Sequence, residues 1–294
     1  MAVMGYSALS ELDITRYNSA IRIMAAQLVL HPQFFAQEDI EPKSHAAVFT
    51  TWDKASAAVA DTLLTGTYDL TNPDPTTLTE SQKTVTAYER GKVTASMQGV
   101  RATAILDVAE AQKSIVAINM AEGLDNAAAY GIYGALTVED TLVGPLTWGH
   151  VLKTARDFED AVPKFGDGLY GAIISPFTKF DLFGDADMLK GFIPVTKYTN
   201  PELVYNYELG ARYGFRWTVG GSAYHATTDQ VRHDYPVFFG PGAFGQANGY
   251  DPEMVIKFGL DTMDRILYVS WKAQRGYGVI NTSYARNYDC VPTA

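Results

Sequence analysis

Residues 101–130 read RATAILDVAEAQKSIVAINMAEGLDNAAAY, and this stretch decides the fold more than any other. Apolar and small residues recur in it at steps of three and four, which places them on one face of a helix. That face consists of Ile105, Val108/Ala109, Gln112, Ile115/Val116, Asn119/Met120, Leu124 and Ala127/Ala128. The helix would be a rod of roughly 40 Å, long beside the mean of about 11–12 residues in globular proteins. Gly131 and Gly134 predict its end.

Toward the N-terminus, residues 1–45 predict an arm that contains one helix. Thr15 can cap this helix, and His31-Pro32 ends it because a residue before proline avoids the helical region. The residues after it, 33–45, are polar and predict an extended connector. The apolar face of the arm helix consists of Tyr17, Ala20, Ile21, Met24 and Leu28.

Between the arm and the long helix, residues 46–97 predict a projecting hairpin. Residues 48–52 and 84–88 are rich in β-branched and aromatic side chains, the composition of strands. The stretch 71–77 reads TNPDPTT, whose prolines and short polar residues predict a turn or an exposed tip. Few large aliphatic residues lie near this tip. We therefore expect an arm with little core of its own, stabilised by lying on another surface.

After the long helix the pattern changes to mixed helix and strand. Residues 147–158 predict a helix and 169–174 a buried strand. Ser175 then predicts the cap of a short helix with Pro176 at its first position. This helix–strand–helix order indicates an α/β or α+β lobe inserted before the C-terminal part.

The last third of the chain predicts short strands. Residues 210–250 are rich in glycine and aromatic residues and predict loops and short strands, and residues 254–260 fit either a strand or a helix. Residues 266–271 and 277–281 predict two closing strands.

Composition and charge limit the class of protein. The 294 residues are 47% hydrophobic and 19% charged, which is enough for a core and fits one large or two modest domains. The 18 tyrosines and 14 phenylalanines fit a surface covered by partners, and they fit an ordinary monomer equally well. The net charge is −10 and no Lys/Arg block occurs. Direct binding to nucleic acid is therefore disfavoured, although an acidic wall can enclose DNA.

The chain carries no recognisable export signal. Its N-terminus lacks a basic segment followed by an apolar run, so we expect no signal peptide. Residues 23–30 form an apolar stretch too short to span a bilayer. With Cys290 as its single cysteine, the chain can form neither an internal disulfide nor a cysteine-based zinc site. We expect an intracellular, soluble protein.

One glycine motif suggests a nucleotide site. Residues 240–245 read GPGAFG and match the dinucleotide pattern G-x-G-x-x-G. That pattern needs the loop to open a helix, whose N-terminus holds the pyrophosphate. Here the following residues, 246–249, do not predict a helix start. We interpret the stretch as a glycine-rich surface loop.

The other candidate groups do not form a recognisable centre. His225 and His233, with Asp229 and Asp234 nearby, lack the i, i+4 spacing of a zinc-binding helix, and we interpret them as polar loop residues. No G-x-S-x-G or P-loop pattern occurs, and Cys290 has no base near it in sequence.

Adjacent carboxylates also lack the geometry of a catalytic pair. Glu139-Asp140 and Glu159-Asp160 are neighbours in sequence, so on a helix their side chains point about 100° apart. We interpret them as solvated surface residues. The sequence therefore predicts no catalytic residue, no cofactor-binding residue and no metal ligand, hence no cofactor and no enzyme activity.

Three stretches together resemble one branch of the major capsid proteins of tailed phages. Residues 174–182, ISPFTKFDL, resemble its strand-to-helix stretch I-H-P-x-x-x-x-D-L. Residues 206–216, NYELGARYGFR, resemble its N-G-E-I-G-R-I-G-G-F-R. Residues 270–281, which contain Trp-Lys-Ala at 271–273, resemble its closing W-K-A … G … V-L-N strands. The three blocks come in the family's order and cover about residues 170–285.

The chain also departs from the family pattern at several positions. A serine replaces the usual histidine, two tyrosines replace glycines, and an alanine replaces the first arginine, with an arginine one place on. These positions are Ser175, Tyr207, Tyr213, Ala211 and Arg212. Gly214 and Gly276 are expected where the backbone approaches closely or takes a positive φ.

The resemblance implies the Hong Kong 97-type (HK97-like) fold, an α+β class with an N-arm, an E-loop hairpin, a P-domain with a long spine helix and a sheet, and an A-domain. On this basis we expect the following divisions: an N-terminal arm at 1–45, an E-loop at 46–98, a P-domain with spine helix at 99–140, an A-domain at 141–250, and closing P-domain strands at 251–294.

The function that the resemblance implies is assembly. The chain would form the icosahedral or prolate head shell of a tailed phage from hexamers and pentamers of itself, enclosing double-stranded DNA without sequence-specific binding and without a membrane. A separate scaffolding protein, a portal and a decoration protein are the implied partners. The implied location is the virion, after assembly in the host cytoplasm. The alternatives are an encapsulin-type shell around enzyme cargo, a soluble nucleotide-binding enzyme, and a tail or decoration protein.

Overall fold

The computed structural model describes most of the chain outside its N-terminus and several connecting segments. The described residues are 29–40, 44–52, 80–98, 108–184, 193–194, 208–221, 223–228, 230–258 and 265–293. The predicted arm helix, apart from its last residues, and the predicted tip at 71–77 lie outside them.

The long predicted helix is present as α4 (Val108–Tyr133), 26 residues in length. Most of its predicted face is buried, including Gln112, Val116 and Met120. Ile115, a predicted member of this face, is 60% exposed because its neighbour Val116 takes the inward position.

The predicted helix stop at Gly131 is wrong, since α4 continues through it to Tyr133 and Gly134 follows directly. Gly131 has a packing role instead. A Cβ there would lie 2.7 Å from the carbonyl oxygen of Tyr277, on a strand that crosses the helix.

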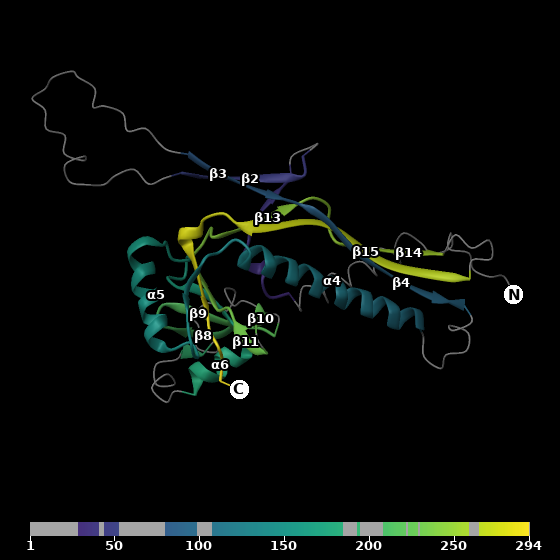
Figure 1. The fold of residues 1–294 in the computed structure, drawn as a ribbon. Helices are drawn as coiled ribbons and strands as arrows, with labels where there is room; N and C mark the ends of the chain where they lie inside the picture. The colour runs from purple at the N-terminus through teal and green to yellow at the C-terminus, as the bar shows by residue number, and fades with distance from the viewer. Residues whose placement is uncertain are drawn as a thin grey trace, which may run out of the picture.

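The helix α4 lies along a five-stranded sheet (Figure 1). Four of its strands follow the order β1-β13-β15-β14, and the fifth, β4, pairs antiparallel with β15 along its full length. The five strands are β1 (Ala36–Asp39), β13 (Phe244–Asn248), β15 (Ile266–Val279), β14 (Glu253–Phe258) and β4 (Tyr88–Met97).

The side chains of β15 that face α4 alternate with outward-facing ones, as a pleated strand requires. The inward set is Leu267, Val269, Trp271 and Ala273. The indole N–H of Trp271 donates to the side-chain oxygen of Asn119 on α4 at 3.0 Å.

Two predictions about these strands are wrong. The two closing strands at 266–271 and 277–281 form one strand, β15, because the glycines between and within them stay in register with β13. Residues 88–97, expected within the projecting hairpin, form β4 in the body of the molecule. Of the stretch at 254–260, which fitted either element, residues 254–258 lie in strand β14, and residues 259–260 lie outside the described part of the chain.

The predicted hairpin strands are confirmed. β2 (Ala46–Trp52) and β3 (Glu80–Thr86) pair antiparallel along seven residues each, from Ala46 opposite Thr86 to Trp52 opposite Glu80. In Figure 1 this hairpin lies above β13 and the end of β15, on the side of the sheet away from α5.

The second lobe is built on a seven-stranded mixed sheet with the order β5-β16-β12-β6-β9-β8-β7. Its strands are β5 (Val138–Thr141), β16 (Ala285–Asp289), β12 (Val237–Phe239), β6 (Tyr170–Ile174), β9 (Phe215–Val219), β8 (Glu208–Arg212) and β7 (Ile193–Pro194). Outside the sheet lie α5 (Trp148–Ala161), α6 (Pro176–Phe183), the hairpin β10 (His225–Thr228) with β11 (Val231–Asp234), and the 3₁₀ turns η2 (Pro32–Phe34) and η5 (Thr282–Tyr284).

The local signals predicted for this lobe are confirmed. α5 begins after Thr147, and all five residues of β6 are buried. The hydroxyl oxygen of Ser175 accepts a hydrogen bond from the backbone N–H of Thr178 at 3.0 Å, which caps α6 with Pro176 at its first position.

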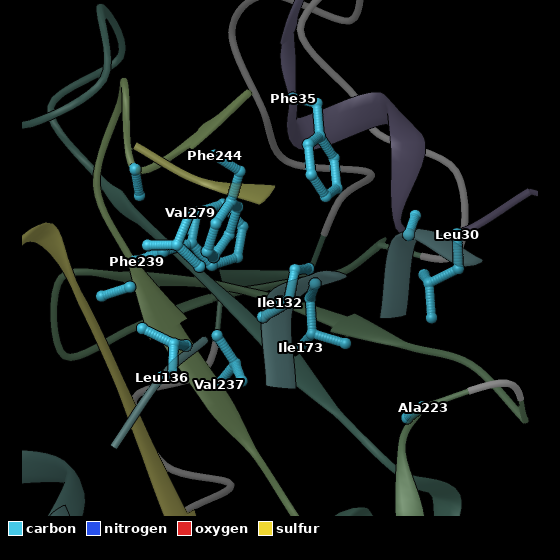
Figure 2. Packing of buried hydrophobic residues seen from close by; sticks show 13 residues of the cluster. Leu30, Phe35, Ile132, Leu136, Ile173, Ala223, Val237, Phe239, Phe244 and Val279 are labelled. Atoms are coloured by element: carbon cyan, nitrogen blue, oxygen red, sulfur yellow. The ribbon is translucent and has the colours of Figure 1, made fainter. Parts of the chain in front are cut away.

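A shared core joins α4 and both sheets (Figure 2). Ile132 of α4, Ile173 of β6 and Phe239 of β12 pack there with Phe244 of β13 and Val279 of β15. Because elements of both lobes contribute to this cluster, the two lobes share one hydrophobic core. The fold class is α+β, as expected.

The expected division of the chain at 250 and 251 stays a prediction. Strands from the two sides of it are interleaved in space: β13 pairs with β15 in one sheet, and β16 pairs with β12 in the other.

Candidate assembly surfaces

The hairpin β2–β3 has little core of its own. Its buried residues are Ala47 and Phe49 on β2 and Val85 on β3. Val48 is half exposed and Trp52 is 60% exposed. Most other side chains of β3 are exposed as well. A two-stranded ribbon of this kind is marginal in water by itself, so its free faces are candidate contact surfaces.

The base of the hairpin rests on glycines of β13 and β15. A Cβ at Gly245 would lie 2.7 Å from the ring of Phe49, and one at Gly276 would lie 2.7 Å from the carbonyl carbon of Thr86. A Cβ at Gly278 would meet Val85 at 3.2 Å. Gly276 therefore permits an approach of the backbone that a side chain would block, as expected, while the contact at Gly278 is looser. Among the described residues, these contacts hold the hairpin to the body at the end where Ala46 pairs with Thr86.

Further exposed apolar side chains follow the α4–β4 layer and α6. On α4 they include Ile115, Ile118 and Tyr130. The remaining members of this set are Tyr88, Val93 and Met97 of β4 and Phe177 and Phe180 of α6. Within the described part of the chain these apolar side chains are exposed at several separate places, which makes them candidate contact positions.

The point where the N-terminal arm joins the body is fixed by a buried carboxylate that the sequence analysis missed. Asp125 of α4 accepts hydrogen bonds at one oxygen from the backbone N–H groups of Leu30 at 2.9 Å and His31 at 2.7 Å. The His31 ring nitrogen Nδ1 lies 3.1 Å from the same oxygen. In the sequence, the one indication of this contact is that Asp125 directly follows Leu124, which is predicted to be buried.

A second buried polar cluster surrounds Asp234. The hydroxyl groups of Ser175 and Thr178 donate to its carboxylate, and Arg232 Nε donates at 2.7 Å. The Cys290 thiol donates to the backbone oxygen of Asp234 at 3.3 Å. Each polar group in this cluster has a partner, so it stabilises the lobe.

Cys290, close to the C-terminal end of the given sequence, is buried in the core of the second lobe. Its exclusion from water raises the pKa of the thiol to about 12. A thiol held neutral in this way is a poor nucleophile.

The histidines and acids considered as metal ligands lie in and beside one hairpin but do not converge on a common point. His225 and Asp234 are cross-strand neighbours in the β10–β11 hairpin. His233 Nδ1 instead contacts Asp289 at 2.7 Å, and Asp229 lies outside the described residues. His225 and His233 lie on strands, not in loops. Within the described ranges no group of three or more His, Cys, Asp or Glu side chains is arranged to hold a metal.

The glycine motif at 240–245 connects two strands, β12 and β13, so no helix follows it as a nucleotide loop requires. It is more buried than the predicted surface loop: of its residues, Gly242 is exposed, with φ +73°, and Pro241 is partly exposed.

The adjacent carboxylates engage basic side chains in different ways. Glu139 lies 2.6 Å from Arg286, and Glu159 lies 3.4 Å from Lys164.

Of the helices within the described residues, none combines the length and the apolar character needed to cross a membrane.

One resembling block forms a compact turn between β8 and β9. Gly214 has φ +76°, as expected, and Tyr213, which stands where the family pattern has glycine, also takes a positive φ of 52°. The turn thus keeps the backbone that a glycine favours. Arg216 of this block is buried, forms an ion pair with Asp167, and lies 3.2 Å from Glu208.

Comparisons with known proteins find no match for the sequence but several for the structure. No family sequence model and no curated protein sequence matches the chain. The capsid of Ralstonia phage GP4 has a TM-score of 0.68 at 10% identity, over 100% of this chain and 99% of that one. The capsid of cyanophage P-SCSP1u gives 0.63 at 10%, over 90% and 89%. That of cyanophage Pam1 gives 0.62 at 14%, over 99% and 95%.

These likenesses extend over 90% or more of this chain and 89% or more of each of the three capsid chains. The chain therefore has the HK97-like fold of tailed-phage capsid subunits.

Proposed function

We propose that this chain is the major capsid protein of a tailed phage and builds the head shell that encloses its double-stranded DNA. The observation that carries the proposal is the structural likeness to the GP4 capsid over 100% of this chain and 99% of that one. The principal partner of the chain is itself, in hexamers and pentamers.

The exposed hairpin supports a mechanism based on overlap. β2–β3 is held to its own subunit at its base and offers both faces beyond it. In the proposed shell it lies across a neighbouring subunit, while the arm at 1–45 extends toward another. Permanent interfaces of this kind bury roughly 2,000 Å² or more. Contacts of modest strength become decisive when they are repeated around a closed shell.

We also assign the chain to the branch with the closing Trp-Lys-Ala strand. Trp271 and Ala273 are buried against α4, and Lys272 on the opposite face lies 2.6 Å from Glu253 of β14. The motif therefore has a structural basis: two residues fill the core under the spine helix, and the third stays in solvent on the outer face.

The remaining parts of the proposal concern location and partners. The subunit is not an enzyme, assembles in the host cytoplasm and resides in the virion. A scaffolding protein, a portal and a decoration protein accompany it. The net charge of −10 suits a wall that encloses DNA without binding its sequence.

Electron microscopy of the expressed full chain tests the proposal. Closed shells or ring-shaped capsomers are expected, and particles that contain DNA together with a portal distinguish a phage head from a cargo compartment. A chain that stays monomeric or forms only tubes contradicts the proposal.

A deletion of residues 71–77 tests the overlap mechanism. The shortened hairpin should leave a soluble subunit that does not close shells. The matched control replaces the same seven residues by glycine and serine, which preserves the reach of the hairpin. Normal particles from the deletion would refute the mechanism.

A further inference from the structure

The end of the second lobe that carries α6 presents two exposed aromatic rings. Figure 1 shows this helix at the lower end of the lobe, near the C-terminus. Phe177 and Phe180 are three residues apart on α6, so they share one side of the helix, and Phe180 is 72% exposed. The guanidinium carbon of Arg232 lies 4.2 Å from the centroid of the Phe177 ring. These three side chains are named the aromatic knob.

A pocket of about 380 Å³ lies on the adjacent flank of the same helix. Asp181 and Leu182 of α6 form one wall of this α6 pocket, and the first turn of α5 with the residues before it forms another. Trp148 is fixed there because its indole N–H donates to the carbonyl oxygen of Leu182 at 3.1 Å. A cavity of about 150 Å³ is enough to hold a benzene ring, so the pocket has room for a phenylalanine side chain. The other lining residues are Pro145, Leu146, Thr147, Gly149 and Thr293.

The charges of the knob and the pocket are complementary. Of the described residues that line the pocket, only Asp181 is charged, and its carboxylate accepts a hydrogen bond from the backbone N–H of Thr293 at 3.0 Å. The knob carries the cation of Arg232, whose side chain remains 30% exposed although its Nε donates to Asp234. A cationic aromatic surface therefore matches a largely apolar pocket with one carboxylate in its wall.

The directions of the knob and the pocket suit a ring of identical copies. Phe180 and Asp181 are adjacent in sequence, so their side chains leave α6 about 100° apart. When the knob of one copy enters the pocket of the next, the contact is heterologous, and repeated contacts of this kind close into a ring. In a ring of five or six copies the two contact faces of each subunit point about 110–120° apart. The angle on α6 is close to this value.

We propose that the aromatic knob of one copy inserts into the α6 pocket of the next copy and so joins subunits into rings of five and six, with α6 along the ring axis. This inference rests on the proposed function, which it extends by naming a contact within the ring. It is separate from the overlap of the hairpin β2–β3 with a neighbouring subunit.

Cross-linking between two differently tagged variants of the full chain tests the contact. Gly184→Cys places a thiol beside the knob, one turn beyond Phe180, and Pro145→Cys places one at the pocket. A short bismaleimide should link this pair of variants at least about fivefold more than Gly184→Cys with Asp160→Cys. Asp160 is exposed at the far end of α5, roughly 18 Å from its first turn. The buried Cys290 is common to all variants.

Two outcomes of this experiment overturn the inference. Equal linkage in the two mixtures would mean that the knob does not meet the pocket. Links mainly between two copies of the Gly184→Cys variant would assign the knob to a twofold contact, which does not build a ring.

Substitution of the knob gives a second readout. Phe180→Glu removes the ring and places a carboxylate near Asp181 of the next copy, so the yield of rings and shells in electron micrographs should fall at least about tenfold. Phe180→Tyr keeps an aromatic ring and should retain assembly. Because Phe180 is exposed, both variants should unfold at the urea concentration of the unsubstituted chain, which separates a lost contact from a lost fold.

Failure of the inference and failure of the proposed function give different results. Normal rings and shells from Phe180→Glu would overturn the inference and leave the proposed function in place. If the unsubstituted chain forms neither rings nor shells, the proposed function fails, and the cross-linking of the mixed variants still decides whether the knob meets the pocket.

Discussion

The substitution Gly276→Ala tests how the hairpin is attached to the body. Gly276 lies in β15, opposite Ala247 of β13, with the backbone of Thr86 and Ala87 across its face. A methyl group at this position would lie 2.7 Å from the Thr86 carbonyl carbon and 3.0 Å from the Ala87 Cα. These are main-chain atoms at the junction of β3 and β4, so no side-chain rotation relieves the overlap.

The cost follows from the displacement required. Carbon atoms pack at about 3.5–4.0 Å, so the junction must move by about 1 Å. Overpacking of this kind costs about 1–3 kcal/mol, and because backbone must shift we expect the upper half of that range. The free energy of unfolding of the isolated subunit is measured by urea titration with circular dichroism and tryptophan fluorescence. The same shift tilts the hairpin, so shell yield should fall as well.

Two other glycines calibrate this measurement. At Gly278 the nearest atom is a flexible methyl of Val85 at 3.2 Å, and Gly278→Ala should cost about 1 kcal/mol or less. At Gly144 nothing lies within 4 Å, and Gly144→Ala should be neutral. Ordinary surface substitutions change the free energy of unfolding by up to about 0.5 kcal/mol. If Gly276→Ala changes it by no more than this, the close approach at Gly276 does not anchor the hairpin.

Three further predictions concern buried polar groups. Asp125→Ala removes the acceptor of two backbone N–H groups and should lower the free energy of unfolding in urea by about 2–4 kcal/mol, while Asp125→Asn, which keeps an acceptor oxygen, should lose less. Burial raises the pKa of the Cys290 thiol to about 12, so between about pH 9 and pH 12 the thiol loses its proton in the unfolded chain but keeps it in the folded one. The free energy of unfolding, measured by urea titration, should therefore fall by about 1.4 kcal/mol from this group by pH 10. The variant Cys290→Ala should not show this loss. Arg216→Met leaves the carboxylates of Glu208 and Asp167 without this cation and should cost about 3–5 kcal/mol in the same assay.

The elements that the sequence predicts well are those with local signals. α4, β6 and α6 are recognisable because periodicity, a buried apolar run and a Ser175-Pro176 cap are properties of neighbouring residues. β2 and β3 are recognisable from their composition.

β4 could not be predicted as a body strand, because YERGKVTASM is polar and its place depends on pairing with β15 more than 170 residues later. The same holds for the surfaces proposed for assembly. Asp125 is an unremarkable acidic residue in a helix until the arm supplies the N–H groups of Leu30 and His31. The role of Gly276 is set by the backbone of a hairpin that precedes it by nearly two hundred residues. Such contacts between distant segments leave no periodicity in either one.

The position of β16 has a consequence for synthesis. It lies between β5 and β12 in the seven-stranded sheet, and every other described strand precedes it in the chain. A nascent subunit therefore holds a sheet with a gap until residues 285–289 have left the ribosome. Chains that terminate early expose two unpaired strand edges and the core beneath them, which marks them for proteolysis. In the proposed shell, which needs many identical copies, incomplete subunits would thus be removed before they could join.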